Sequence, residues 1–132
     1  EVIPLKAQTI NNINFTIHSA VLEEETLKVR LSVTNKSPND FYVTVKAIKL
    51  VDEYGMEYLP DVNKGTISRH LFGKEIPKDN RVVSEIVFEN IKSKGAKTLV
   101  IQNVSDSYHF IWDYMITLPQ IEEKKDIKGA VT

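Results

Sequence analysis

The chain has 132 residues, a formal net charge of −1 at pH 7, 42% hydrophobic residues and no cysteine. This length suits a single domain with a proper core. The balanced charge lacks the basic excess that collects phosphates, so we predict no nucleic-acid partner. The lack of cysteine excludes disulfides and thiolate chemistry. No apolar run approaches the roughly 20 residues of a membrane-spanning helix.

The N-terminal segment predicts two strands joined by a turn. Residues 2–10 read as a weak edge strand, and Asn11-Asn12 is a turn signal. From Ile13 onward apolar and polar residues alternate, which is the period of a strand with one buried face. We expect this second strand to keep its odd positions inward as far as Val21.

The clearest strand of the sequence follows a short acidic link. Residues 23–25 are all glutamate, and the run from Leu27 to Thr34 then has an apolar residue at every odd position. Two alternating strands with a short link predict a hairpin. The strand ends at the loop 35–40, which contains a proline that cannot donate a hydrogen bond to a sheet.

A change of phase marks the next strand. Residues 41–47 are apolar at odd positions, whereas Ile48 and Leu50 are apolar at even positions. Such a flip predicts a bulge, or a strand that crosses between sheets. Residues 52–55 then predict a tight turn, because their glycine can adopt positive φ, and 56–60 predict a short return strand.

The least regular segment, 61–80, carries the first candidate binding residues. Long loops without regular structure are uncommon in compact domains and are often functional. This one presents an aromatic side chain and several donors, Arg69, His70, Phe72 and Lys74. Two interpretations stay open: the segment is a recognition surface, or it is a flap that covers one end of the domain.

Three further strands complete the pattern. We predict them over 82–88, 99–104 and 108–118, and apolar residues on both faces of the first indicate a central, buried position. Residues 120–132 are charged and lack periodicity, so we interpret them as a tail that is disordered or a linker. About 7–9 strands with regular turn signals predict an all-β domain over 1–119, an antiparallel β-sandwich.

The last predicted strand is the most aromatic part of the chain. Tyr108, Phe110, Trp112 and Tyr114 share one of its faces. We expect that face to belong to the core, with Trp112 as a packing residue. Two alternatives stay open: an exposed aromatic platform that stacks sugar rings, as in carbohydrate-binding sandwiches, and a sheet edge that pairs with a partner chain.

The sequence contains no motif for catalysis or metal binding. The histidines, His18, His70 and His109, are not at metal-ligand spacing from one another, and we expect His18 to be an ordinary solvated side chain. There is no Gly-x-Ser-x-Gly elbow, no Gly-rich phosphate loop and no EF-hand spacing of carboxylates. We therefore expect that the protein is not an enzyme and takes no cofactor or metal.

Three segments in order resemble a known family. They are 31–37 (LSVTNKS), 49–58 (KLVDEYGMEY) and 81–89 (RVVSEIVFE). The most specific part is the hairpin with Asp52, Gly55 and Tyr58. Over about residues 13–118 the chain resembles the immunoglobulin-like domains of unknown function in exported proteins and lipoproteins of Gram-positive bacteria. The resemblance implies an immunoglobulin-like sandwich, no transferable catalytic residues and an extracytoplasmic location, often with a lipid anchor upstream.

Together these observations predict a non-enzymatic extracytoplasmic binding or scaffold module. We expect it to be extracellular or on the cell surface, with its leader or anchor removed. Its partner would be another protein or a cell-envelope component, and membrane contact would come only through an upstream anchor absent from this chain. The candidate binding residues are Arg69, His70, Phe72, Lys74 and Trp112. The alternatives are a carbohydrate-binding module with an aromatic platform and, less favoured, an enzyme whose site is assembled from loops.

Overall fold

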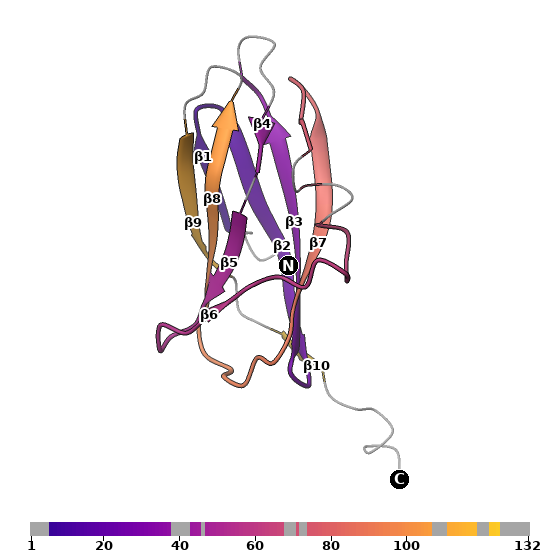
Figure 1. The fold of residues 1–132 in the computed structure, drawn as a ribbon, viewed down its shortest axis with the longest axis vertical. Helices are drawn as coiled ribbons and strands as arrows, with labels where there is room; N and C mark the ends of the chain where they lie inside the picture. The colour runs from indigo at the N-terminus through magenta and orange to yellow at the C-terminus, as the bar shows by residue number, and fades with distance from the viewer. Residues whose placement is uncertain are drawn as a thin grey trace, which may run out of the picture.

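The computed structural model describes residues 6–37, 43–45, 47–67, 71, 74–106, 111–118 and 122–124. The described residues form ten strands in two sheets that enclose one hydrophobic core (Figure 1). The predicted all-β sandwich is therefore confirmed. In the described part of the chain, no helix is long and apolar enough to cross a membrane.

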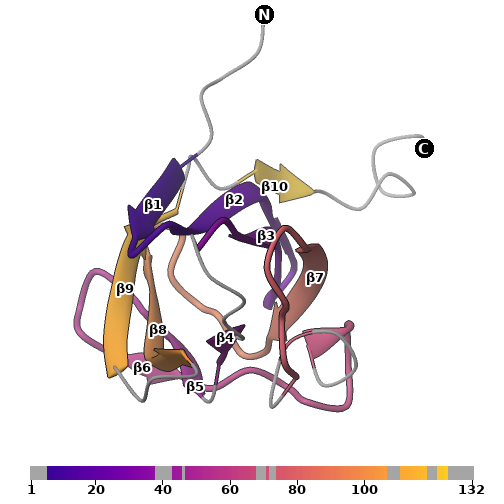
Figure 2. The same cartoon turned by 90° about the horizontal axis from the view of Figure 1, so that it is seen from above.

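The two sheets form opposite walls, with β1 beside β9 where they meet (Figure 2). Sheet A has the order β1-β2-β3-β7, and β10 also pairs with β2. Its strands are β1 (Lys6–Ile10), β2 (Ile13–Glu23), β3 (Thr26–Asn35), β7 (Arg81–Phe88) and β10 (Glu122–Lys124). Sheet B has the order β4-β8-β5-β6, and β9 also pairs with β8. Its strands are β4 (Val43–Thr44), β5 (Ala47–Val51), β6 (Glu57–Tyr58), β8 (Thr98–Asp106) and β9 (Ile111–Thr117).

The β2–β3 hairpin follows the predicted alternation until a bulge in β2. The odd positions of 27–33 are buried, as the sequence indicates. In β2 the register shifts after Ile17, and the buried face moves to Ala20 and Leu22. The prediction that Val21 faces inward is therefore wrong, because the extra residue of a bulge reverses the faces of the strand beyond it.

β7 lies at the edge of sheet A, although its apolar residues on both faces predicted a central strand. The reason is residues 61–66, here called the strap, which run along its outer edge. The backbone N–H groups of Asp61 and Thr66 donate to the carbonyls of Val87 and Glu85 at 2.8 and 3.0 Å. Val87 is consequently only 3% exposed. The strap covers edge groups that would otherwise be open to pairing with another chain.

The phase change predicted in sheet B is present and arises from a bulge, with no crossing between sheets. Val45 and Ile48 are both buried, although they have opposite parity. Ile48 is the register partner of Ile101 on β8, and the register of β8 with β9 shifts between Ile101 and Val104, both also buried. Asn103 between these two residues has a φ of 57°, which accommodates the bulge.

The inward face of β9 belongs to the core, as expected from the sequence. Tyr114 is fully buried, and its ring lies 4.4 Å from that of Phe15 in sheet A, centroid to centroid. Its hydroxyl lies 2.7 Å from the Ile13 carbonyl and 3.1 Å from the Ile10 carbonyl, to which it donates. Burial raises the pKa of this hydroxyl to about 12. Tyr114 therefore ties the two sheets together.

Part of the segment interpreted as a tail is a strand. Residues 122–124 form β10, which pairs in parallel with Val21–Glu23 of β2. Residues 120, 121 and 125–132 lie outside the described residues.

Candidate binding groove

The turn between β5 and β6 is built on the side chain of Asp52. Its Oδ1 accepts hydrogen bonds from the backbone N–H groups of Tyr54 and Met56, each at 2.9 Å. The N–H of Gly55 donates to the Asp52 carbonyl at 3.1 Å. Gly55 has a φ of 84°, in the left-handed region that glycine adopts without strain. The tight turn predicted from 52–55 is confirmed.

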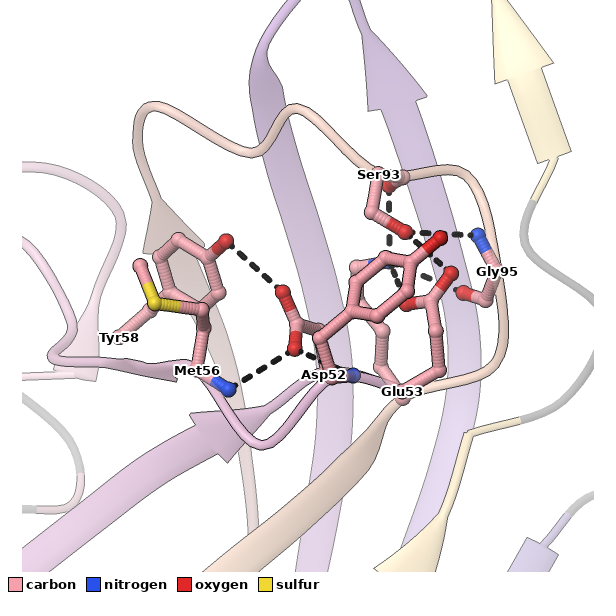
Figure 3. Close-up of polar contacts among 8 residues, drawn as sticks. Asp52, Glu53, Met56, Tyr58, Ser93 and Gly95 are labelled. Carbon is pink, nitrogen blue, oxygen red and sulfur yellow. Dashed lines mark hydrogen bonds and ion pairs between the residues drawn. The ribbon is translucent and has the colours of Figure 1, made fainter.

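The second oxygen of the Asp52 carboxylate holds the return strand. The Tyr58 hydroxyl donates to Oδ2 at 3.0 Å (Figure 3). Desolvation acts to raise the pKa of Asp52, but the hydrogen bonds from Met56, Tyr54 and Tyr58 outweigh it and lower that pKa. Desolvation and the neighbouring carboxylate raise the pKa of the Tyr58 hydroxyl. Asp52 is therefore ionised at neutral pH and engages the hairpin through both oxygens.

A second network joins the hairpin to residues 90–97, here called the clamp loop. The Ser93 hydroxyl donates to the Glu53 carboxylate, and the Gly95 N–H donates to the Ser93 hydroxyl at 3.2 Å. The Lys97 ammonium donates to the Ser93 and Gly95 carbonyls at 2.8 and 2.9 Å, and lies 3.8 Å from Glu53 Oε1. The hydrogen bond from Ser93 is the main cause that lowers the pKa of Glu53. Because the Lys97 side chain is fully buried, these oxygens replace the water that its charge has lost.

A groove of about 680 Å³ lies between the hairpin and the clamp loop. Tyr54, Met56 and Tyr58 form one side, residues 90–94 form the other, and Lys92 stands exposed on the rim. Figure 3 shows the two networks from which both sides are built. The polar side chains Asp52, Glu53 and Ser93 bond mainly to one another and to the backbone, so the groove presents apolar surface.

Four of the five large apolar side chains exposed among the described residues lie in one stretch of the chain, from Tyr54 in the hairpin turn to Val62 in the strap. Tyr54, Met56, Leu59 and Val62, here called the apolar strip, are 80%, 59%, 77% and 51% exposed. The remaining large apolar side chain exposed among the described residues is Met115 on β9. Single exposed apolar residues are ordinary, whereas a concentration of them marks an interaction site.

The structure describes two of the five candidate binding residues, and it places neither in the groove. Lys74 is exposed in the segment after the strap, and Trp112 is partly buried on β9. Arg69, His70 and Phe72 lie outside the described residues. The two described candidates, Lys74 and Trp112, and the groove are therefore separate features of the molecule.

The irregular segment contributes to the core. Ile67, Leu71 and Ile76 are fully buried. The Leu71 N–H donates to the Ile67 carbonyl at 3.0 Å, which is the spacing of a helical turn. Of the two interpretations left open by the sequence, these observations favour the covering flap for the described part of this segment.

Trp112 packs against the core, as the sequence analysis expects. The indole Nε1 of Trp112 is buried and has no hydrogen-bond partner of suitable geometry among the described residues. Trp112 is nevertheless close enough to the Tyr114 hydroxyl to oppose the rise in the pKa of Tyr114. Tyr114 of the predicted aromatic face is fully buried, and Tyr108 and Phe110 of that face lie outside the described residues.

The sequence predicted the turn of the hairpin but gave no prediction of the clamp loop. Two signals could have identified it. Lys97 has the same parity as the buried Leu99 and Ile101, so the strand pattern extended backward predicts a lysine facing inward. Gly95 is the second signal, because a Cβ there would overlap the Glu53 carboxylate. Only the fold shows which carboxylate lies opposite.

Comparison with known families gives one match. A family model described as "Domain of unknown function (DUF4352)" matches residues 6–109, a range that includes the hairpin and the clamp loop. The expectation of a domain of unknown function is confirmed at that level. No curated protein matched the chain. Within the described ranges, no three His, Asp or Glu side chains group closely enough to hold a metal ion.

Proposed function

The chain belongs to the DUF4352 family, and we propose that it acts as a non-enzymatic binding or scaffold module. The observation that carries this proposal is the apolar groove, which is lined by Tyr54 and Met56, two exposed residues of the apolar strip. Water-exposed apolar surface of this kind is stabilised when a partner covers it. The proposed partner is another protein or a component of the cell envelope.

The rigidity of the hairpin supports a recognition role. Asp52 holds the backbone of Tyr54 and Met56, and Lys97 holds the backbone of the opposite side at Ser93 and Gly95. A preorganised surface loses less conformational entropy on binding than a flexible one. Exposed aromatic and methionine side chains on a fixed backbone are typical of binding hot spots.

The charges around the groove favour a partner with apolar and acidic side chains. The carboxylates of Asp52 and Glu53 accept hydrogen bonds from within the hairpin and the clamp loop. Lys92 is exposed on the rim and extends from the same loop. An acidic group beside the apolar contact would approach Lys92, which adds orientation and a faster association rate.

The location of the domain is part of the proposal. The sequence resemblance to immunoglobulin-like domains of exported proteins supports an extracytoplasmic site of action, and the sandwich agrees with such a fold. An extracytoplasmic partner would be a second envelope protein or a surface polymer. Fractionation of cells that express the full gene product, followed by detection of this domain, tests the location directly.

A matched pair of variants tests the binding surface. Tyr54→Ser with Met56→Ser removes the centre of the apolar strip, whereas Met115→Ser removes an exposed apolar side chain from β9. Because all three side chains are exposed, we expect unchanged circular dichroism. We expect the double variant, immobilised, to retain fewer proteins and polymers from a solubilised envelope fraction, and to bind any purified partner at least tenfold more weakly. Equal retention and affinity for the double variant and Met115→Ser would exclude this strip as the site.

A carbohydrate ligand is the alternative, and the exposed ring of Tyr54 supports it. Titration of the protein with defined glycans distinguishes it, with the fluorescence of the single tryptophan as one signal and calorimetry as the other. Saturable binding of a glycan that is lost in the Tyr54→Ser, Met56→Ser variant would replace the protein partner by a sugar.

A further inference from the structure

A cluster of basic side chains lies on the outer face of sheet A, away from the groove. His18 occupies the bulge of β2, and its Nε2 lies 2.8 Å from the Ser32 hydroxyl of β3. The same Nε2 lies 3.3 Å from a guanidinium nitrogen of Arg81 on β7. Ser32 is only 2% exposed, although its position faces outward. The sequence predicted a solvated histidine, but His18 instead contacts two other strands.

The contact with Arg81 favours the neutral form of His18. A guanidinium only donates hydrogen bonds, so its approach to Nε2 requires a lone pair on that nitrogen. A neutral ring with its proton on Nδ1 supplies that lone pair, and the Ser32 hydroxyl competes with Arg81 for it as a second donor. Burial lowers the pKa of His18, and the charges of Arg81 and Arg30 lower it further.

Positive charge dominates the surroundings of His18. Arg30 lies on β3, and both guanidinium groups are exposed. Among the described residues, no carboxylate forms an ion pair with either of them. The acidic residue nearest in register is Glu85, opposite Arg30, and on β10 the nearest charged residue is Glu122, opposite Val21 of β2. With His18 neutral, the two arginines face one carboxylate.

There is space beside the cluster for a small ligand. Arg30 of β3, Thr66 of the strap, and Val83, Ser84 and Glu85 of β7 line a surface hollow of about 290 Å³. Val83 is the register partner of Ser32, so the hollow adjoins the buried hydroxyl. Of the cluster, Arg30 lines this hollow, so a ligand there meets its guanidinium beside the strand pair that carries Ser32 and Arg81.

We propose that this cluster binds a tetrahedral oxyanion, a phosphate or sulfate group, between Arg81, Arg30 and a protonated His18. When His18 takes up a proton, its Nε2 no longer accepts from Arg81, and three cations face one another. An oxyanion accepts hydrogen bonds from the freed Arg81 donors, the His18 N–H and the Ser32 hydroxyl together. Protonation therefore converts a self-contained contact into an anion site.

Binding and protonation are linked in a definite direction. Because the anion favours the charged ring, anion binding raises the pKa of His18. By the same coupling free energy, protonation of His18 at lower pH strengthens anion binding. One linked proton allows a gain of at most about tenfold in affinity per pH unit between the pKa values of the free and bound states. Above that window the site holds the anion weakly.

The first test follows the ring protons of His18 by NMR, with sodium sulfate as the probe. Titrations from pH 8 to pH 5 in sulfate and in chloride of equal ionic strength give two pKa values, and His18→Gln assigns the signal among the three histidines. We expect a saturable rise of the His18 pKa in sulfate alone. An identical pKa in both salts would overturn the proposal.

A charge-matched pair of variants separates a site from general attraction. Arg81→Gln and Lys28→Gln each remove one exposed positive charge, and Lys28 stands on β3 two residues before Arg30. We expect Arg81→Gln to weaken sulfate binding at least tenfold and Lys28→Gln to weaken it less than twofold. We expect Glu85→Gln to strengthen it. Equal losses in the first two variants would show attraction to the whole face and would refute the site.

A comparison of probes identifies the source of the oxyanion. Inorganic phosphate and sulfate represent a free ion, and dextran sulfate represents the same group on a polymer, with unsulfated dextran as its control. Tighter binding of dextran sulfate at equal sulfate concentration, still lost in Arg81→Gln, assigns the site to a polymer-borne ester. Equal affinity per sulfate group assigns it to the free ion. Binding of unsulfated dextran with equal affinity would overturn the oxyanion assignment.

Discussion

Gly65 should be far more sensitive to a side chain than Gly55, although both have positive φ. Gly65 has a φ of 67° and Gly55 one of 84°. At Gly65 a Cβ would overlap the backbone oxygen of Glu85 and lie 3.2 Å from Val87 Cγ2, whereas at Gly55 nothing lies within 4 Å. Gly55→Ala is therefore the control for Gly65→Ala, because the two share the backbone strain but not the collision.

The expected loss of stability is the sum of three effects. An L-residue in the left-handed region costs about 1–2 kcal/mol, of which the stiffer unfolded chain recovers about 0.4–1 kcal/mol. Gly55→Ala should therefore lose about 1 kcal/mol. Gly65→Ala must also move the strap, which breaks the 3.0 Å hydrogen bond from Thr66 to Glu85 and uncovers part of Val87. These losses add about 1 kcal/mol each, for a total of about 3 kcal/mol.

Guanidinium denaturation of both variants measures this difference, with tryptophan fluorescence and far-UV circular dichroism as independent signals. We expect Gly65→Ala to be about 2 kcal/mol less stable than Gly55→Ala. Since the strap covers the edge of β7, we also expect Gly65→Ala to associate at high concentration in light scattering. Equal stability of the two variants would refute the argument that the strap presses against β7.

Three other predictions follow from buried or titrating groups. Tyr114→Phe should lose about 1–3 kcal/mol, because the Ile13 carbonyl loses its donor. In the wild type, stability should fall as pH rises above 10, because the pKa of Tyr114 is higher in the folded state than its ordinary value. Tyr114→Phe should abolish that fall, and denaturation measured over a range of pH checks both effects. Lys97→Met should cost about 1–3 kcal/mol in thermal or chemical denaturation and loosen the clamp loop, and faster amide exchange there is its signature. The pKa of His18 is lowered from 6.5 in the folded state, so its contribution to the free energy of unfolding is complete above pH 6.5 and is lost as pH falls below it. His18→Gln should therefore flatten the curve of stability against pH in that range. An unchanged slope would contradict the assignment.

Local side-chain patterns were sufficient to predict the strands and the hairpin. The alternation of 27–33 shows which face of β3 is buried, because successive residues of any strand point to opposite sides. The turn at Asp52 and Gly55 could also be predicted, since a carboxylate that binds the next N–H groups and a glycine with positive φ act within five residues. The buried position of Tyr114 follows from its place on the apolar face of β9.

The bulges and the position of β7 depended on distant parts of the chain. Nothing near Val21 in sequence indicates that one extra residue at His18 reverses the faces of β2. Likewise the edge strand β7 can carry the apolar Val87 on its outward face because the strap, more than twenty residues earlier in the chain, covers that side chain. Periodicity reports how many faces are buried but not which segment buries them.

The groove and the basic cluster also combine features set by neighbours in sequence with contacts between distant segments. The sequence by itself determined an all-β sandwich and an exposed, rigid turn at Gly55, since those features arise from neighbours along the chain. Only the tertiary structure decided that Lys97 meets Glu53 and that His18 meets Ser32 and Arg81. These groups are separated by up to 63 residues, and hydrogen bonds and charges act over a few ångströms in space, so strand register had to be known before either contact could be seen.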